Sequence, residues 1–378
     1  MRILTTPCLA GEFEQMWRTL SAGKPAQMSA AWLRSQHGRI ADTHRYHFLV
    51  DDDGCEALAA AACMIIDRNQ TDVSFRLDSQ LLAKGVGEQS TSASRLGDSI
   101  GPTYVCAIGS AHLPGLVAKD HLPKGALSHL IAHLESEAVA NGAEAIAFFN
   151  FEESRWPELE AAFAETDYLK AVFAGETLLP LRGVDGFSGY LERLPRQRRR
   201  TVRHEIRTFS EQGMELSSHA VEHLTTEAED LIVAHQERYG WTNVRGRVRN
   251  RIERTEKFFP GMEFLFARDS ARELVGIMGL VAEPGGGSTA AIYGSRRNGA
   301  FVYFNMFYYE RIRRALVRGC HELRFGTQTY RAKVARGCEV RPLYTFFKVF
   351  GDCRGLTELV AHRNQVEIDS WQNSLETT

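Results

Sequence analysis

Arginines crowd one short segment in the second half of the chain, and their spacing is suited to contacts with phosphate. Residues 196–207 read RQRRRTVRHEIR, so cationic side chains would surround much of a helix formed here. Clustered arginines bind phosphate through planar N–H forks and are a common footprint of nucleic-acid contacts. The alternative is an exposed helix with local ion pairs to Glu192 and Glu205. The candidate phosphate-binding residues are Arg196, Arg198, Arg199, Arg200, Arg203, Arg207 and, from a second cluster, Arg247.

The second cluster consists of arginines at 245, 247, 249, 251 and 254, and it follows two aromatic residues, Tyr239 and Trp241. An aromatic ring beside cations can stack on a nucleic-acid base or on a substrate ring. We expect this segment to be a loop that serves as a lid or as an RNA contact, with Trp241 as the contact residue.

Other polar residues of the second half could act on a reacting carbonyl. Tyr308 and Tyr309 share a predicted helix with Tyr303 and Asn305, where a hydroxyl could donate a proton or bond a donor group. Because aromatic neighbours on this helix also indicate core packing, we expect a site role for one of Tyr308 and Tyr309.

Two cations lie in a polar loop that we predict over residues 326–337. Lys333 could stand beside an oxyanion or a leaving oxygen, and Arg336 could bind a phosphate or a carboxylate. The alternatives are a solvated lysine and a structural arginine. In the first half, His112 beside the turn 113–115 is a candidate to line a cleft, although a lone histidine is more often structural.

The composition is that of a soluble globular protein, with 44% hydrophobic and 24% charged residues. Domains usually hold about 100–200 residues, so a length of 378 residues predicts two domains. No stretch approaches the roughly 20 apolar residues of a membrane span, and the N-terminus lacks the apolar segment of a signal peptide. We therefore expect a cytoplasmic protein. Seven scattered cysteines without a CxxC pair predict reduced thiols and no metal site.

Charge is divided unequally along the chain. Residues 1–186 contain 15 Lys and Arg against 24 Asp and Glu, a net charge of −9, and residues 187–378 contain 30 against 23, a net charge of +7. A single basic half is expected where only that half meets a polyanion, such as a nucleotide cofactor or RNA. Segregation of surface charge without a function is the alternative.

The spacing of apolar residues predicts an α/β order in both halves. In the first half it predicts a loop over 83–99, a domain boundary at residue 181, helices over 11–21, 29–36, 127–141 and 156–163, and strands over 44–50, 57–66, 104–108, 145–149 and 172–179. In the second half it predicts helices over 187–212, 227–239 and 302–319, and strands over 263–268, 274–281, 289–293, 322–325 and 344–349. Three strands, a helix and two strands is the order of an acetyltransferase core.

Three segments of the second half resemble the Fem-like branch of the GNAT superfamily. They are the arginine-rich segment Tyr190–Glu205, the segment Tyr303–Glu310 with its continuation to Cys320, and the segment Phe325–Cys338. This family includes peptidoglycan-related aminoacyltransferases and transferases of natural-product gene clusters. The resemblance implies an α/β fold of tandem GNAT-like domains, residues 1–181 and 182–378, each a mixed, mostly antiparallel sheet flanked by helices.

One departure from the superfamily pattern bears on the donor substrate. Acetyl-CoA enzymes have Q/R-x-x-G-x-G/A before the helix that follows the three strands, where backbone N–H groups bind pyrophosphate. The corresponding residues here are Arg296–Phe301, and Phe301 occupies the position of a small residue. The resemblance therefore implies aminoacyl-tRNA as the donor, and acyl-CoA is the alternative.

The resemblance implies an acyl- or aminoacyltransferase that forms an amide on a small-molecule amine, such as a natural-product intermediate, or on a cell-wall precursor. The alternatives are an acyl-CoA-dependent N-acyltransferase and a non-catalytic binding protein. No tightly bound cofactor is implied. The acidic first domain is expected on the acceptor side and the basic second domain on the donor side. The predicted catalytic residues are Lys333, where related proteins have a functional lysine, Tyr309 and Tyr308; the predicted donor- or substrate-binding residues are Tyr303, Asn305, Tyr330, Arg336, Trp241 and His112.

Overall fold

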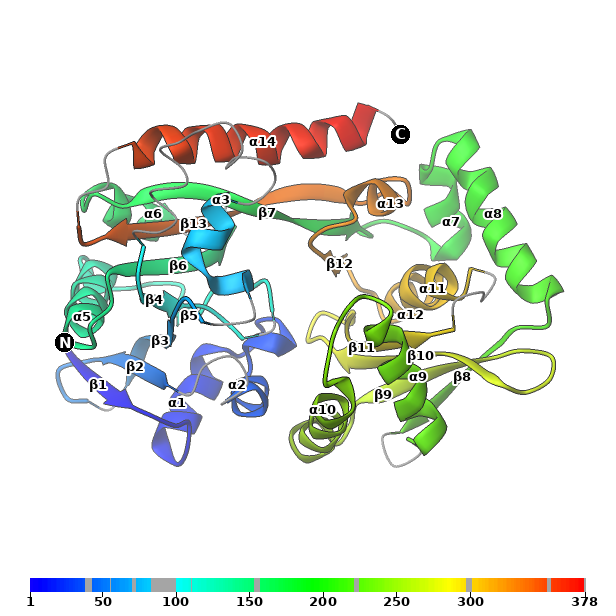
Figure 1. Ribbon diagram of the computed structural model, residues 1–378, viewed down its shortest axis with the longest axis horizontal. Coiled ribbons are helices and arrows are strands. Elements are labelled where there is room, and N and C mark those ends of the chain that lie inside the picture. The colour runs from blue at the N-terminus through cyan, green and yellow to red at the C-terminus, as the bar shows by residue number, and fades with distance from the viewer. Residues whose placement is uncertain are drawn as a thin grey trace. The chain divides into compact units, whose positions relative to one another are not determined.

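Two compact units make up the chain in its computed structural model (Figure 1). The structure describes residues 1–376 except 38–42, 55, 70–72, 83–99, 110, 153–156, 221–223, 297–300 and 352–354. The first unit comprises residues 1–176, 326–331 and 340–378, and the second comprises residues 177–325 and 332–339. The chain thus leaves the first unit close to the predicted boundary at 181, but its C-terminal segment belongs to the first unit rather than to the second.

The C-terminal segment joins the first unit through strand β13 (Glu339–Val349), which pairs antiparallel with β6 (Ala145–Phe151). Backbone pairing between segments so distant in the chain leaves no signal in local spacing, which is why contiguous halves were predicted. The charge asymmetry does not depend on this difference. Assigned to the structural units, the first has 19 Lys and Arg against 28 Asp and Glu, and the second has 26 against 19.

The first unit is built around a mixed sheet with the strand order β1-β2-β3-β4-β6-β13-β7, and β5 adds to β3. Only β4 and β6 form a parallel pair among the registers of the described strands. The further strands are β1 (Arg2–Thr6), β2 (His44–Val50), β3 (Ala57–Ile66), β4 (Thr103–Cys106), β5 (Leu116–Ala118) and β7 (Leu169–Pro180). The strands predicted over 44–50 and 57–66 are confirmed as β2 and β3, which pair antiparallel.

Both faces of this sheet are covered, and β6 shows why. Its side chains alternate between the two faces, so Ile146 and Phe148 pack in one core while Ala147 and Phe149 pack in the other. Helices α5 (Ala126–Ala140) and α6 (Pro157–Ala164) cover the first core, and α3 (Leu77–Leu82) and α14 (Leu356–Glu376) cover the second. The remaining helices are α1 (Glu12–Leu20), α2 (Ala30–Gln36), and the 3₁₀ turns η1 (Ala26–Met28) and η2 (Val73–Phe75).

The second unit contains a four-stranded antiparallel sheet in the order β11-β10-β9-β8. Its strands are β8 (Glu215–Ala220), β9 (Glu263–Arg268), β10 (Leu274–Ala282) and β11 (Ser288–Ser295), and the end of β7 lies beside β12 (Glu322–Gly326). The helices are α7 (Gly186–Arg193), α8 (Arg196–Glu211), α9 (Thr226–Glu237), α10 (Val244–Phe258), α11 (Val302–Phe304), the π-helix η5 (Asn305–Glu310) and α12 (Arg311–Val317).

Several predicted elements of the second unit need correction. The helix predicted over 187–212 is two helices, because the residue before Pro195 is extended and breaks the helix there. The arginines of 245–254, predicted to lie in a loop, form most of α10. The predicted loop 326–337 contains a short helix, α13 (Tyr330–Val334). The predicted loop 83–99 and most of the segment 296–301 lie outside the described residues.

Among the described helices, none is both long and apolar enough to span a bilayer.

Candidate functional site

Helix α8 separates its arginines from its apolar side chains. Val202 and Phe209 are buried, while the side chains of Arg196, Arg200 and Arg203 are exposed. The other arginines of the helix are less free: Arg199 donates to the carbonyl oxygen of Leu194 at 3.3 Å, and Arg207 lies 3.6 Å from Glu211. Arg198 is half-buried.

Arg196, Arg200 and Arg203 carry the charge that the fold does not neutralise. Within the described part of the chain, none of the three has an ion pair or a side-chain hydrogen bond. The local pairing considered as an alternative does not occur at Glu205, because its carboxylate faces the interior. We call these three side chains the arginine face of α8.

A buried ion pair occupies the opposite side of α8. The carboxylate of Glu205 accepts two hydrogen bonds from Nη2 of Arg336, at 2.8 and 2.7 Å, and both side chains are 6% exposed. Arg336 also donates from Nη1 to the carbonyl oxygen of Ala332 at 2.7 Å and from Nε to the hydroxyl of Tyr309 at 3.1 Å. Each of the three guanidinium nitrogens of Arg336 thus donates to a protein group, and a substrate contact of this residue stays a prediction.

Tyr309 completes this cluster. Its hydroxyl donates to Glu205, and burial raises its pKa far above the usual range, with Glu205 adding to the rise and Arg336 opposing it. Asn305, also buried, donates from its amide to the carbonyl oxygens of Phe301 at 3.0 Å and of Glu205 at 3.3 Å. These groups tie α8 to η5 and to the segment after α13.

The predicted site tyrosines lie in or against one hydrophobic core of the second unit. Tyr308 and Tyr309 are both fully buried, and the ring of Tyr308 stacks on Phe325 with centroids 4.9 Å apart. Tyr303 is half-buried and stacks on Phe307 with centroids 5.0 Å apart. The π-helical turn widens the helix at these residues, and such turns are frequent at functional sites.

Lys333 lies on α13 rather than in a solvated loop. It is 2% exposed, and its carbonyl oxygen accepts from the backbone N–H groups of Arg336 at 2.9 Å and Cys338 at 3.2 Å. Gly337, at a φ of 85°, makes the left-handed turn that ends this segment. The buried cluster therefore fixes the backbone three residues from Lys333.

Tyr330 belongs to the first unit. It is 8% exposed, its hydroxyl accepts from the backbone N–H of Gly175 at 2.9 Å, and its ring lies 5.9 Å from that of Trp371. These contacts give it a packing role. Trp241, by contrast, is 55% exposed in the second unit. Its described ring contact is with Arg247 and not with Glu205 or Arg336.

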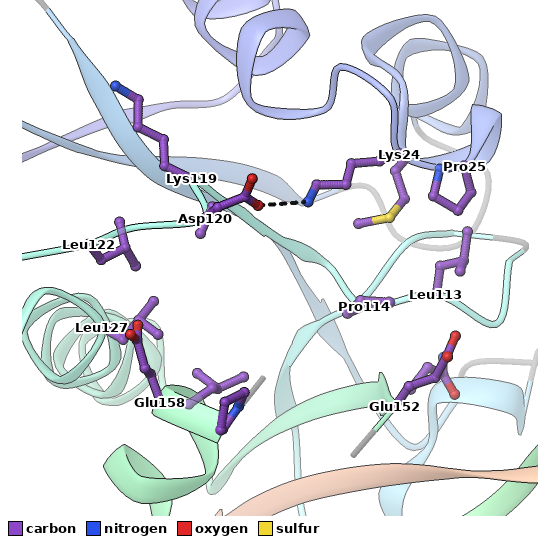
Figure 2. Close-up of a pocket in the computed structure, with 15 residues that line it drawn as sticks. Lys24, Pro25, Leu113, Pro114, Lys119, Asp120, Leu122, Leu127, Glu152 and Glu158 are labelled. Atoms are coloured by element: carbon purple, nitrogen blue, oxygen red, sulfur yellow. Dashed lines mark ion pairs between the residues drawn. The ribbon is translucent and has the colours of Figure 1, made fainter. Parts of the chain in front are cut away.

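The first unit contains a cavity of about 340 Å³ (Figure 2). Its lining combines apolar side chains with charged and amide groups, and Lys24 and Asp120 of this lining form an ion pair at 3.9 Å. Glu152 follows β6, and Glu158 comes from the start of α6 (Figure 2). The lining consists of Lys24, Pro25, Met28, Leu113, Pro114, Ala118, Lys119, Asp120, Leu122, Leu127, Asn150, Glu152, Pro157, Glu158 and Leu159.

Two residues at the end of β6 distinguish this cavity from a packing defect. Asn150 is 8% exposed and holds a left-handed φ of 69°, a conformation that costs energy outside glycine and often marks functional sites. Glu152 is likewise only 8% exposed although it is a carboxylate. The turn 113–115 predicted to line a cleft contributes Leu113 and Pro114, whereas His112 is exposed and is not part of the lining.

Four lining residues were not predicted as site residues: Lys24, Asp120, Asn150 and Glu152. One signal was available: Asn150 and Glu152 are polar residues at the end of the apolar run that forms β6. Lys24 and Asp120 carry no such mark, since they come from separate loops. In the described residues, no group of three or more His, Cys, Asp or Glu side chains is arranged to hold a metal ion.

Residues 94–374 match the FemAB-like family, which is described as a family of peptidoglycan biosynthesis/recognition. The chain belongs to this family. No curated protein matches its sequence.

Solved structures confirm the fold. FemX matches with a TM-score of 0.60 at 11% identity, over 95% of this chain and 100% of FemX. A conserved protein of unknown function from Bacteroides thetaiotaomicron matches with a TM-score of 0.59 at 11% identity, over 92% and 100% of the two chains. The C-terminal domain of a putative lysylphosphatidylglycerol synthetase from Agrobacterium fabrum matches with a TM-score of 0.56 at 10% identity, over 94% and 95%. The predicted Fem-like, mixed α/β fold is therefore correct.

Proposed function

We propose that this FemAB-like protein is a transferase that moves an aminoacyl group from aminoacyl-tRNA to an amine and forms an amide. The arginine face of α8 carries the proposal: Arg196, Arg200 and Arg203 present three charges without a partner in the described chain, in a unit with a net charge of +7. Uncompensated arginines along one helix suit the phosphates of an RNA backbone. The names of FemX and of the lysylphosphatidylglycerol synthetase domain agree with a transfer of this kind.

The acceptor amine is assigned to the cavity of the first unit. The carboxylates of Glu152 and Glu158 stand at a largely apolar lining, which suits an ammonium group attached to an apolar or mixed body. A volume of about 340 Å³ admits a small molecule or one end of a cell-wall precursor. An acceptor with a primary amine on such a body fits both a natural-product intermediate and a peptidoglycan precursor.

The reaction itself needs few protein groups. The neutral amine nitrogen attacks the ester carbonyl, the carbon–nitrogen bond forms, and the bond to the ribose oxygen breaks. The amine loses a proton and the ribose oxygen gains one, so the atoms balance without a nucleophile or a cofactor from the protein. Lys333 is the proposed cation for the leaving oxygen, and the cluster of Glu205, Arg336 and Tyr309 positions its backbone.

Transfer from labelled aminoacyl-tRNA to a panel of amines tests the proposal. We expect labelled amide that disappears when the charged tRNA is treated with RNase beforehand. A parallel reaction with acyl-CoA in place of tRNA tests the other donor. Amide formed from acyl-CoA but not from charged tRNA would overturn the choice of donor, and absence of amide with both donors would overturn the assignment as a transferase.

Lys333→Ala examines the assigned chemistry, with Lys348→Ala as a control because Lys348 does not line the cavity of the first unit and its ammonium pairs with Glu135 at 3.4 Å. We expect the first variant to lower kcat at least about ten-fold, which corresponds to roughly 1.4 kcal/mol of barrier. An unchanged kcat in Lys333→Ala would remove this residue from the mechanism.

A further inference from the structure

The exposed aromatic side chains of the described chain lie together in the turn that joins α9 to α10. Tyr239 is 72% exposed and Trp241 is 55% exposed, whereas large apolar side chains elsewhere in both units are mostly buried. No phenylalanine or other tyrosine or tryptophan with a described side chain is exposed to this degree. A pair of aromatic rings held in water at one turn needs an explanation other than core packing.

The turn is held in a defined conformation. Gly240 and Asn243 take left-handed φ angles of 81° and 52°. The backbone N–H groups of Tyr239 and Trp241 both donate to the carbonyl oxygen of Gln236, at 3.0 and 3.4 Å. The ring of Tyr239 lies 5.1 Å from that of His235. The aromatic rings are therefore presented on a preformed backbone, which lowers the entropic cost of binding a ligand to them.

Arg247 is placed beside Trp241. Its guanidinium lies 5.0 Å from the centre of the indole ring, and its Nη2 donates to the carbonyl oxygen of Thr242 at 3.1 Å. It has no carboxylate partner among the described residues, whereas Arg245 pairs with Asp230 at 2.7 Å and Arg249 with Glu229 at 3.3 Å. The guanidinium of Arg247 is thus held by the indole face of Trp241 and the carbonyl oxygen of Thr242, with no carboxylate beside it among the described residues.

The local charge favours an anionic ligand. Residues 238–249 contain four arginines and no acidic residue; Asp230 and Glu229 pair with Arg245 and Arg249, and Arg238 and Arg247 have no carboxylate partner among the described residues. A ring with a guanidinium at its side can stack on a base while the cation contacts the adjoining phosphate. Duplexes keep their bases stacked inside and offer no free base face, so this geometry selects a single strand.

We propose that this turn, with Trp241 and Tyr239 as the rings and Arg247 as the cation, binds unpaired bases of a single-stranded RNA segment. The inference rests on the proposed function, because it assigns a contact for the unpaired 3′ end of the donor tRNA. It adds to the arginine face of α8 a contact that recognises bases as well as phosphates.

The fluorescence of Trp241 provides a direct test. Trp17, Trp32 and Trp371 are buried, so of the tryptophans that the structure describes only Trp241 is open to a stacking base. We expect a four-nucleotide RNA ending in CCA to quench the emission, and the same strand annealed into a blunt duplex to quench it much less. Equal quenching by single strand and duplex, or none by either, would overturn the proposal.

Variants separate stacking from charge. Fluorescence anisotropy of the labelled oligonucleotide should show roughly ten-fold weaker binding for Trp241→Ala, and nearly unchanged binding for Trp241→Phe, which keeps an aromatic face. Arg247→Gln should weaken binding and lower its salt dependence. Val317→Ala is the matched control, because Val317 is an apolar side chain of the second unit that is 89% exposed. Equal losses in Val317→Ala and Trp241→Ala would contradict a specific platform.

The aminoacyl-transfer assay keeps this inference apart from the proposed function. Trp241→Ala should raise the KM for charged tRNA and leave kcat nearly unchanged, because the turn binds the donor and does not take part in bond formation. If the wild-type protein transfers aminoacyl groups and Trp241→Ala does so with an unchanged KM, the base platform is wrong and the proposed function stands. If the oligonucleotide stacks on Trp241 but the wild-type protein transfers no aminoacyl group, the base platform stands and the proposed function is wrong.

Discussion

Each unit of this protein contains a buried arginine–glutamate pair, and the two pairs are built differently. In the first unit, Arg363 and Glu367 lie one turn apart on α14, 2.8 Å from each other and at most 1% exposed. In the second unit, Glu205 and Arg336 are 131 residues apart in the chain and join α8 to the segment after α13. A local pair strengthens one helix, whereas a distant pair determines where two segments lie.

The further hydrogen-bond partners of the two pairs also differ. Arg363 donates to the carbonyl oxygens of Gln80 at 3.0 Å and Phe173 at 3.3 Å, and Glu367 accepts from the indole of Trp371 at 3.0 Å, so the pair anchors α14 in its core. The pair of the second unit instead holds Tyr309 and the backbone that carries Lys333. We infer that the first pair serves stability and the second also serves the proposed chemistry.

Breaking the distant pair should have the largest effect. Glu205→Ala leaves the buried guanidinium of Arg336 and the hydroxyl of Tyr309 without their carboxylate, and we expect a loss of about 4 kcal/mol in the free energy of unfolding. Denaturant titration measures it. Glu211→Ala on the same helix is the control, because Glu211 is 65% exposed and should change stability by less than about 0.5 kcal/mol. Similar losses in both variants would contradict a buried ionic anchor.

Breaking the local pair should cost less. Glu367→Ala removes one hydrogen bond of Arg363 and one of Trp371, and we expect about 3 kcal/mol, since Glu205→Ala removes two hydrogen bonds of Arg336 and one of Tyr309. Aminoacyl transfer measured well below the unfolding midpoint should be preserved in this variant. A fall in kcat as large as that of Glu205→Ala would remove the functional difference between the pairs.

Replacing the distant pair as a whole sharpens the same comparison. A buried ion pair exchanged for apolar residues of similar volume often regains stability, so Glu205→Leu with Arg336→Met should recover most of the loss of Glu205→Ala. The transfer rate should stay low, because the hydrogen bonds that position the backbone near Lys333 are gone. Recovery of stability and rate together would show that the pair is structural only.

Acid should destabilise the first unit through a buried, neutral histidine, His47. His47 is fully buried, with Nε2 2.7 Å from the hydroxyl of Tyr104 and Nδ1 3.0 Å from that of Thr5; burial, and then the charges of His133 and Arg45, lower its pKa to about 3. His47 is therefore protonated below about pH 6.5 in the unfolded chain but only below about pH 3 in the folded chain. The free energy of unfolding falls as the pH falls through that interval.

The low pKa of His47 should lower the free energy of unfolding by roughly 2 kcal/mol between about pH 7 and pH 4.5. In His47→Gln the difference in unfolding free energy between the two pH values should shrink by that amount. His129→Gln, a change at an exposed histidine of α5, should leave the difference as it is in the wild type. If the unfolding free energy of His47→Gln depends on pH as steeply as that of the wild type, the buried neutral histidine is not the cause of the pH dependence.

The local features of this protein could be predicted from its sequence, and the distant ones could not. The strands β2 and β3 follow from apolar runs on either side of Asp51–Gly54, and α5 from one apolar face that ends at Asn141. The break at Pro195 was also visible in principle, because the residue before a proline avoids helical backbone. Three-dimensional pairing across the chain, as between Glu205 and Arg336, has no periodicity to reveal it.

The candidate site shows the same limit. The arginine-rich helix was predicted, but which of its side chains stay free depends on the interior position of Glu205 and on the contacts of Arg199 with α7. Tyr309 and Arg336 were selected for their chemistry, and in the fold they bond to each other. The cavity is lined by residues from five separate segments of the chain, and only the turn at Leu113 and Pro114 was predicted.

Substitutions in the arginine face of α8 should have the smallest effect on stability and the largest effect on donor binding. Arg196→Gln, Arg200→Gln and Arg203→Gln together should change the free energy of unfolding by less than about 1.5 kcal/mol, since exposed surface substitutions rarely cost more than about 0.5 kcal/mol each. Thermal denaturation of the triple variant beside the wild type gives the comparison. A large loss would mean that these arginines are partners in folding.

The most direct test of the account is the kcat/KM for aminoacyl-tRNA of this triple variant as a function of salt. The account predicts a kcat/KM reduced at least ten-fold at low salt, and a slope of log KM against log salt that is lower by about 0.7 to 0.9 for each phosphate contact removed. A triple variant with the wild-type kcat/KM and the wild-type salt slope would contradict the claim that the arginine face of α8 binds the donor.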